Sequence, residues 1–176
     1  MGRKLRIAIV AISVMFTYSG CGVYSLSGIS TDYNTMKTIS IQPFFSDVNL
    51  APANIGQIFT NTIRDYYQTN TNLSLVTSEG DLQIEGGITG YRFTPVAPQS
   101  GGNNQISTAQ QTRLMITVSV SYYNTKDDTY NFENRNFNFF KDFDNSQSQT
   151  AIQTQLIDEI FEQIVLDIFN ASVANW

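Results

Sequence analysis

The sequence lacks histidine altogether and contains a single cysteine, Cys21. Without an imidazole, a Ser-His-Asp relay and a Cys-His pair are both excluded. A single thiol excludes a CxxC redox motif, and the two absences together exclude the Cys and His clusters that bind zinc. The chain therefore has none of the usual nucleophilic, redox or thiolate and imidazole metal sites.

Carboxylates are the remaining candidates for acid–base chemistry. Asp81 lies near Glu85, and Asp127 directly precedes Asp128. Residue alternation predicts a strand for the first pair and a turn for the second, so we interpret both pairs as solvated surface. Gly86-Gly87 falls inside the same predicted strand, not before a helix, which argues against a phosphate-binding loop. We predict a protein that is not an enzyme and that binds no metal or organic cofactor.

Lysine and arginine are scarce, and three of the ten lie within the first six residues. Residues 21–176 keep seven basic residues against fifteen acidic ones, a net charge of −8. Such a chain lacks the basic surface that binds a phosphate backbone, so we expect no nucleic-acid partner. No apolar run approaches the roughly 18 residues that a membrane-spanning helix needs. Any membrane attachment must come from a feature other than a membrane-spanning helix.

Residues 1–21 have the pattern of a bacterial lipoprotein leader: basic residues, an apolar run at 7–16, and Ser19-Gly20 directly before Cys21. Tyr18 stands where such leaders usually have an aliphatic residue, which keeps a buried or free thiol as the alternative. We predict that residues 1–20 are removed and that Cys21 receives a diacylglycerol and an N-acyl chain. Several acyl chains together anchor a protein firmly. Because Gly22 replaces the aspartate of inner-membrane retention and no acidic cluster follows, we predict the periplasmic side of the outer membrane.

The rest of the chain divides into an acylated tether at 21–35, rich in Gly, Ser and Thr, and a single domain at 36–176. A polar loop at 96–110 interrupts the domain and is either disordered or functional. Alternation and helical spacing predict the elements in this order: strand 37–44, helix 53–68, strands 73–76, 82–95, 113–123 and 130–143, and helix 149–169.

Two of the predicted strands contain an irregularity. The apolar face of strand 82–95 changes between Ile88 and Tyr91, which indicates a bulge or a close contact near Gly86-Gly87. A second irregularity is expected at Asn134–Asn136. The economical arrangement is an α+β two-layer sandwich, with a mostly antiparallel sheet of four to five strands, both helices on one face and a polar opposite face.

The last predicted helix has an apolar face wider than one sheet requires. Its inward stripe is Ile152, Leu156, Ile157, Ile160, Ile164 and Ile168. Phe161, Val165 and Phe169 add a shoulder at spacings of four. The shoulder either covers an edge of the sheet or contacts a partner protein.

Several segments, in their order along the chain, resemble the lipopolysaccharide-assembly lipoprotein family, LptE. None is a catalytic signature, so the resemblance depends on their order. The segments are Cys21-Gly22-Val23-Tyr24-Ser25, Ile39-Ser40-Ile41-Gln42-Pro43-Phe44, Gly80 to Gly86 continuing into Ile88-Thr89-Gly90-Tyr91, Arg113-Leu114, Phe137 to Phe143, Ile168-Phe169-Asn170 and Asn175-Trp176.

The resemblance implies a plug inside the LptD outer-membrane barrel that assists the insertion of lipopolysaccharide into the outer leaflet. The polar strand faces would meet the barrel lumen, and the loop at 96–110 would reach toward its exit. Arg92 and Arg113 flank that loop and are the candidates for contact with lipid A phosphates, with ordinary surface arginines as the alternative. The rival interpretation is a lipoprotein of another envelope machine, either a secretin pilotin or an auxiliary subunit of an ABC-type transporter.

Overall fold

The computed structural model describes residues 36–96 and 111–173. The predicted leader, the acylated tether with Cys21, most of the loop at 96–110 and Trp176 lie outside these ranges. The described elements are β1 (Thr38–Ile41), β2 (Phe45–Ser46), α2 (Ile55–Asn70), β3 (Ser74–Val76), β4 (Leu82–Pro95), β5 (Gln111–Asn124), β6 (Phe132–Asp144) and α3 (Gln149–Ser172).

The strands form one mixed sheet of the order β3-β1-β4-β5-β6, with β2 also pairing with β4. The long strands β4, β5 and β6 run antiparallel, as predicted. β1 pairs in parallel with both β3 and β4, and β2 is also parallel to β4. The predicted sheet was mostly antiparallel; the parallel pairing arises because β1 and β2 are joined to β3 through α2, and a crossover through a helix returns the chain in the same direction.

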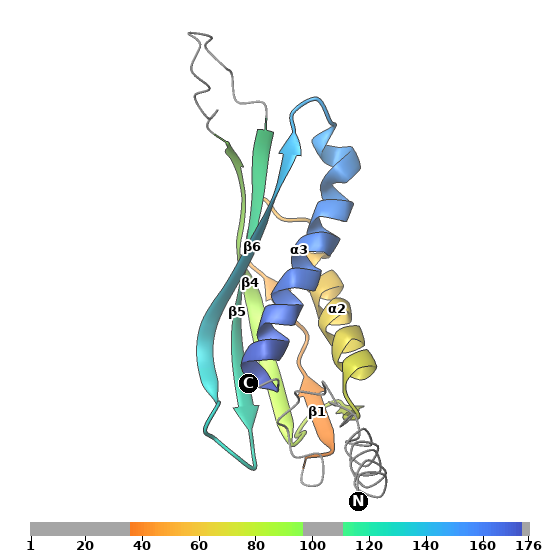
Figure 1. The fold of residues 1–176 in the computed structure, drawn as a ribbon, viewed down its shortest axis with the longest axis vertical. Helices are drawn as coiled ribbons and strands as arrows, with labels where there is room; N and C mark the ends of the chain where they lie inside the picture. The colour runs from red at the N-terminus through yellow and green to blue at the C-terminus, as the bar shows by residue number, and fades with distance from the viewer. Residues whose placement is uncertain (1–35, 97–110, 174–176) are drawn as a thin grey trace, which may run out of the picture.

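Both helices lie on one side of the sheet, which confirms the predicted two-layer α+β fold (Figure 1). α2 begins and ends two residues later than predicted, and Asn54 occupies its N-cap position without a capping bond from its side chain. α3 begins at the predicted Gln149 and continues one turn beyond Phe169 to Ser172. The other face of the sheet, which we call the outer face, has no helix over it within the described part of the chain.

The predicted register change in β4 is present, and it lies slightly beyond the two glycines. β4 and β5 shift register between Ile88 and Gly90, so Thr89 is the extra residue. This shift brings Tyr91 into the core, where it is 3% exposed. The second irregularity is also present, because β5 and β6 shift between Val120 and Tyr122, opposite Asn134 with its positive φ of 48°. Each bulge adds to the local bend and twist of its strand.

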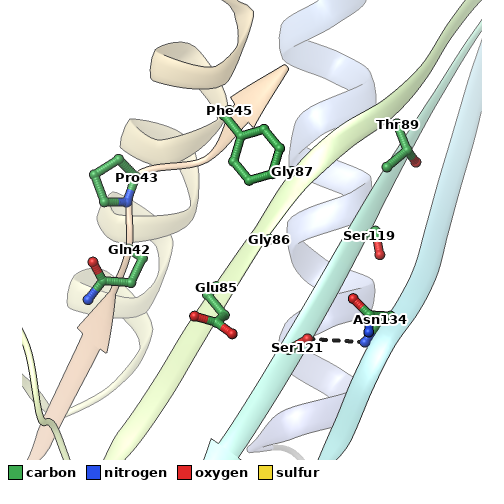
Figure 2. A pocket seen from close by; sticks show the side chains of 10 residues that line it. All are labelled: Gln42, Pro43, Phe45, Glu85, Gly86, Gly87, Thr89, Ser119, Ser121 and Asn134. Carbon is green, nitrogen blue, oxygen red and sulfur yellow. Dashed lines mark hydrogen bonds between the residues drawn. The ribbon is translucent and has the colours of Figure 1, made fainter. Parts of the chain in front are cut away.

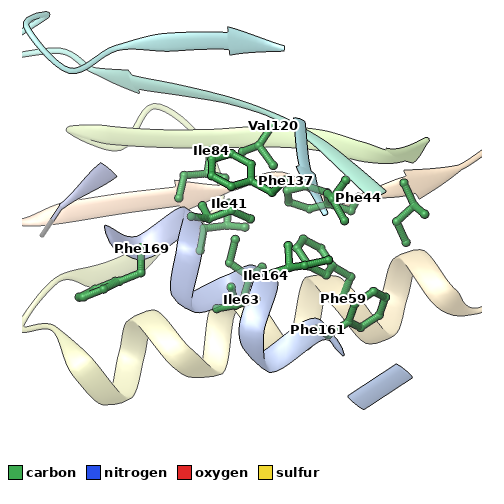
Figure 3. Close-up of a cluster of buried hydrophobic side chains, with 14 of the residues drawn as sticks. Ile41, Phe44, Phe59, Ile63, Ile84, Val120, Phe137, Phe161, Ile164 and Phe169 are labelled. Atoms are coloured by element: carbon green, nitrogen blue, oxygen red, sulfur yellow. The ribbon is translucent and has the colours of Figure 1, made fainter. Parts of the chain in front are cut away.

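The core fills the space between the sheet and the two helices (Figure 3). The predicted inward positions of β5 from Leu114 to Tyr122 are all buried. The rings of Phe44, Phe59 and Phe161 meet edge to face, with centroids 4.8 and 4.9 Å apart. The Tyr67 hydroxyl is fully buried and lies 2.6 Å from Ser172 Oγ, which links α2 to the end of α3. The apolar stripes of both helices are therefore used within the domain.

Candidate functional site

The outer face of the sheet has small and polar side chains along its middle. In its middle, Gly87 of β4 pairs with Ser119 of β5, and Ser119 pairs with Asn136 of β6. The next outward positions, Thr117 and Asn138, also pair. Side chains of this kind are stable in contact with water or with another polar surface. The outer face is thus suited to a polar environment and contrasts with the packed inner face.

The two arginines singled out in the sequence come together at one end of this face. Arg92 pairs with Met115, and Arg113 is two residues away from Met115 on the same strand, so the two arginines are diagonal neighbours. Phe140 of β6 pairs with Met115 and completes a group that we call the basic corner: Arg92, Arg113, Met115, Phe140 and Asp142. It lies at the ends of β4 and β5 that adjoin the predicted loop.

The two arginines of the basic corner differ in their electrostatic state. Arg113 binds Asp142 with both ends of its guanidinium, at 2.7 and 2.8 Å, and its Cζ lies 3.7 Å from the centre of the Phe140 ring. The hydrogen bond raises the pKa of Arg113 and lowers the pKa of Asp142. Arg92 is exposed and its Nη2 lies 3.6 Å from the Met115 sulfur, with no carboxylate of the described ranges in ion-pair distance. Arg92 therefore carries the available positive charge.

A hollow of about 580 Å³ lies in the same face, nearer the middle of the sheet (Figure 2). Its floor consists of Gly86 and Gly87 of β4 with Ser119 and Ser121 of β5. The segment between β1 and β2 supplies one wall, and Asn134 at the β6 bulge lies on the opposite side. The remaining lining residues are Gln42, Pro43, Phe45, Glu85 and Thr89.

The hollow exists because the chain leaves the sheet between two short strands. β1 pairs with β4 up to Ile84, and β2 resumes the pairing at Gly87. Phe45 is 63% exposed, and two of its ring atoms lie 3.1 Å from the position that a Cβ on Gly87 would occupy. Sequence reasoning noted Pro43 and the two glycines only as a strand end and a close contact. A second aromatic residue, Phe45, two positions after the strand-ending Pro43, was the available signal.

The carboxylate pair Asp81 and Glu85 is not brought together for chemistry. Asp81 Oδ2 accepts hydrogen bonds from the backbone N–H groups of Lys37 and Thr38, at 2.9 and 3.1 Å, and from the Thr38 hydroxyl at 3.0 Å. Its own N–H donates to Thr38 Oγ1 at 2.9 Å, and Lys126 Nζ lies 3.5 Å from Oδ1. Asp81 thus joins the start of β1 to the start of β4. Its role is structural.

Asp81→Asn should destabilise the domain at neutral pH and remove part of its acid sensitivity. The Lys37 N–H bond, with those from Thr38, lowers the pKa of Asp81 from 3.8 to about 2. A carboxylate with a lowered pKa stabilises the fold above pH 3.8 and loses this contribution as the pH falls toward 2. Thermal melts should show a lower Tm for Asp81→Asn at pH 7 and a difference from the wild type that shrinks between about pH 4 and 2. Asp128→Asn, in an exposed turn, is the control. A difference in Tm between Asp81→Asn and the wild type that stays constant from about pH 4 to about pH 2 would contradict a stabilising role of the ionised Asp81.

The three residues of the predicted shoulder lie in the core. Phe161 and Val165 are fully buried and Phe169 is 7% exposed. Phe161 meets Phe59 of α2, and Phe169 meets the rings of Tyr66 and Tyr67 at 5.2 and 5.4 Å. The rings of Phe161 and Phe169 therefore pack against α2, and all three shoulder residues are buried within the described domain.

Two absences in the described residues bear on the class of site. Residues 36–96 and 111–173 contain no group of three acidic, His or Cys side chains arranged to hold a metal ion. No helix within these ranges is long and apolar enough to cross a membrane.

A comparison with protein families identifies the kind of domain that carries these features. The family model described as lipopolysaccharide-assembly, LptE, matches residues 36–172, which span every described strand and helix. The chain belongs to the LptE family. The resemblance seen in the sequence is thereby confirmed, and the basic corner, the hollow and the polar outer face are features of an LptE-family domain.

Solved structures show similar architecture at low sequence identity. A hypothetical protein from Chlamydia trachomatis superposes with a TM-score of 0.54 at 10% identity, covering 80% of this chain and 99% of that chain. Rare lipoprotein B from Shewanella oneidensis gives 0.47 at 14% identity, covering 77% and 92%. A minor lipoprotein from Acinetobacter baumannii gives 0.46 at 11% identity, covering 76% and 89%. The first of these shares the fold. No curated protein matches the chain.

Proposed function

We propose that the protein is a non-catalytic subunit of the machinery that assembles lipopolysaccharide in the outer membrane. It is anchored through acylated Cys21, faces the periplasm and binds inside the LptD barrel. The observation that carries this proposal is the family match over residues 36–172. A scaffold role agrees with the placement of Asp81, which accepts hydrogen bonds from the backbone of β1, and of Asp127, which accepts hydrogen bonds within its own turn.

The polar outer face supports the barrel partnership. The interior of a large outer-membrane barrel is polar, so a plug must present polar side chains to it. The outer face does so with rows of Gly, Ser, Thr and Asn, and its small side chains allow close approach of a second surface. The apolar shoulder of α3 is not needed for this contact, because it is buried against α2.

The basic corner is the proposed contact for the phosphates of lipopolysaccharide. Arg92 provides an exposed guanidinium that can bind a phosphate with two hydrogen bonds. Arg113 is held in place by Asp142 and stacked on Phe140, so it contributes a fixed but largely compensated charge. Residues 21–176 carry a net charge of −8, which makes a local concentration of cations necessary for any phosphate contact.

Arg92→Ala should weaken lipopolysaccharide binding by about tenfold, because it removes one charge-assisted contact worth roughly 1.5 kcal/mol. Asp142→Asn should do the opposite and strengthen binding about two- to threefold, because it releases the charge of Arg113. Binding of purified lipopolysaccharide to the immobilised full chain measures both. Lys126→Ala removes a cation at the other end of β5 and serves as the control for net charge. Equal effects of Arg92→Ala and Lys126→Ala would show that only total charge matters.

Co-purification from outer membranes tests the partnership. A C-terminally tagged protein, extracted in mild detergent, should recover LptD in a stable complex. Recovery of a secretin or of an ABC-type transporter without LptD would overturn the proposal and favour a pilotin or a transporter auxiliary. Asp81→Asn, which changes only the domain's stability, should leave the recovered partner the same at temperatures where it is folded.

A further inference from the structure

We propose that the hollow on the outer face is a carbohydrate subsite that binds uncharged sugar residues of the lipopolysaccharide glycan. The proposal rests on the proposed function and adds a second contact to the basic corner. The hollow has a volume of about 580 Å³, within the range of small-ligand pockets. The hollow is separate from the phosphate contact at Arg92, because none of its lining residues belongs to the basic corner.

The chemistry of the lining selects among ligand classes. The lining contains one carboxylate, Glu85, and no cation, so it disfavours phosphate. Tyr123 also feels a second carboxylate: burial, a hydrogen bond with Glu133 and the charges of Glu133 and Glu85 raise the pKa of Tyr123. An acyl chain is disfavoured as well, because Ser119, Ser121 and two amide side chains would face it.

A neutral sugar matches both the apolar part and the polar part of the lining. The exposed ring of Phe45 stands beside the hollow and offers an apolar face with a negative quadrupole, which attracts the C–H face of a pyranose. Glu85 accepts hydrogen bonds from sugar hydroxyls, and Gln42, Ser119 and Asn134 both donate and accept. The glycine floor lets the ring of a ligand approach the backbone, since a side chain at Gly87 would occupy the space next to Phe45.

The position of the hollow suits a ligand that also reaches the basic corner. Both sites lie on the outer face, and Ser119 is separated from Met115 by four residues of β5. At a rise of about 3.3 Å per residue, the separation along the strand is about 13 Å. A phosphorylated glycolipid can place a phosphate on Arg92 and a sugar further along its glycan against Phe45 across such a distance. One molecule would then contact both sites.

The test uses the core oligosaccharide of lipopolysaccharide, released from lipid and dephosphorylated, titrated into the isotopically labelled full chain. The amide signals of Gly86, Gly87 and Ser119 should shift together and saturate. Phe45→Ser should reduce the affinity at least tenfold. Leu50→Ser is the matched control, because Leu50 is 75% exposed on the same segment and is not part of the lining. Absence of shifts at these amides, or equal affinity for the two variants, would overturn the subsite.

Two further ligands separate this inference from the proposed function. Complete lipopolysaccharide should lose affinity in both Arg92→Ala and Phe45→Ser, whereas the dephosphorylated oligosaccharide should be indifferent to Arg92→Ala. If complete lipopolysaccharide binds through Arg92 and Phe45→Ser has no effect, the proposed function stands and the subsite fails. If a peptidoglycan disaccharide binds the hollow and the core oligosaccharide does not, the assignment to lipopolysaccharide is wrong. Loss of these shifts whenever LptD is bound would mean that a partner surface fills the hollow, which would overturn the subsite.

Discussion

Phe161→Asp is expected to unfold the domain, not merely to weaken the binding of a partner. Phe161 is fully buried between the sheet and α2, with its ring centroid 4.9 Å from that of Phe59. Removing a buried phenyl ring costs about 3–5 kcal/mol, and an unpaired carboxylate in its place adds a further desolvation penalty. The total approaches the stability of a typical domain, about 5–15 kcal/mol.

Circular dichroism and amide NMR spectra of the purified variant measure this result. Phe161→Asp should lose the cooperative melt and the dispersion of its amide signals. Phe45→Asp makes the same chemical change at a side chain that is 63% exposed, and it should cost less than about 1 kcal/mol. A folded Phe161→Asp that has lost only its partner would restore the interpretation of the shoulder as a contact surface.

The shoulder illustrates what helical spacing can and cannot predict. Spacings of four correctly placed Phe161, Val165 and Phe169 on one line of α3. They did not reveal what covers that line, because the covering residues Phe59, Tyr66 and Tyr67 lie about a hundred residues earlier in the chain. The relative position of two helices depends on how both pack on the sheet. A wide apolar face therefore predicts burial more reliably than it predicts the burying surface.

The sheet shows the same division between local and long-range information. Alternation predicted the long strands and the inward residues of β5, because period two is a local property. The direction of β1 relative to β4 depends on the crossover through α2, and no pattern within β1 encodes it. Arg92 and Arg113 were chosen for their charge and their place beside the loop. Their proximity across the strands follows from the register, which the bulge at Thr89 sets.

The hollow was missed because its parts come from separate elements. The segment after β1, the glycines of β4, the serines of β5 and Asn134 of β6 contribute to it, and none is unusual alone. Only the pairing of β2 with β4 brings Phe45 above Gly87. Its floor does depend on two residues that the sequence marked as a close contact, Gly86 and Gly87, and these two differ sharply in what surrounds them.

Gly86→Ala should destabilise the domain by about 2–3 kcal/mol, whereas Gly87→Ala should be nearly neutral. A Cβ on Gly86 would lie 2.1 Å from the Ser119 carbonyl oxygen and 2.9 Å from the Phe44 ring. The first of these atoms is backbone of the paired strand β5, so the β4–β5 ladder would have to separate locally, a cost typical of overpacking. A Cβ on Gly87 would approach the Phe45 ring at 3.1 Å and the Phe45 carbonyl oxygen at 3.2 Å, and a small shift of this exposed segment relieves both.

Urea denaturation of the two variants makes the comparison direct, because the added methyl group and the change in the unfolded chain are the same in both. Alanine restricts the unfolded chain more than glycine does, which stabilises each variant by roughly 0.4–1 kcal/mol and offsets part of the strain. The difference between the variants is therefore the more informative quantity. Equal midpoints would mean that β4 and β5 are not as close at Gly86 as the structure places them. A large difference would show that the glycine is required by the backbone of β5, and that the floor of the hollow is fixed by strand pairing before any ligand binds.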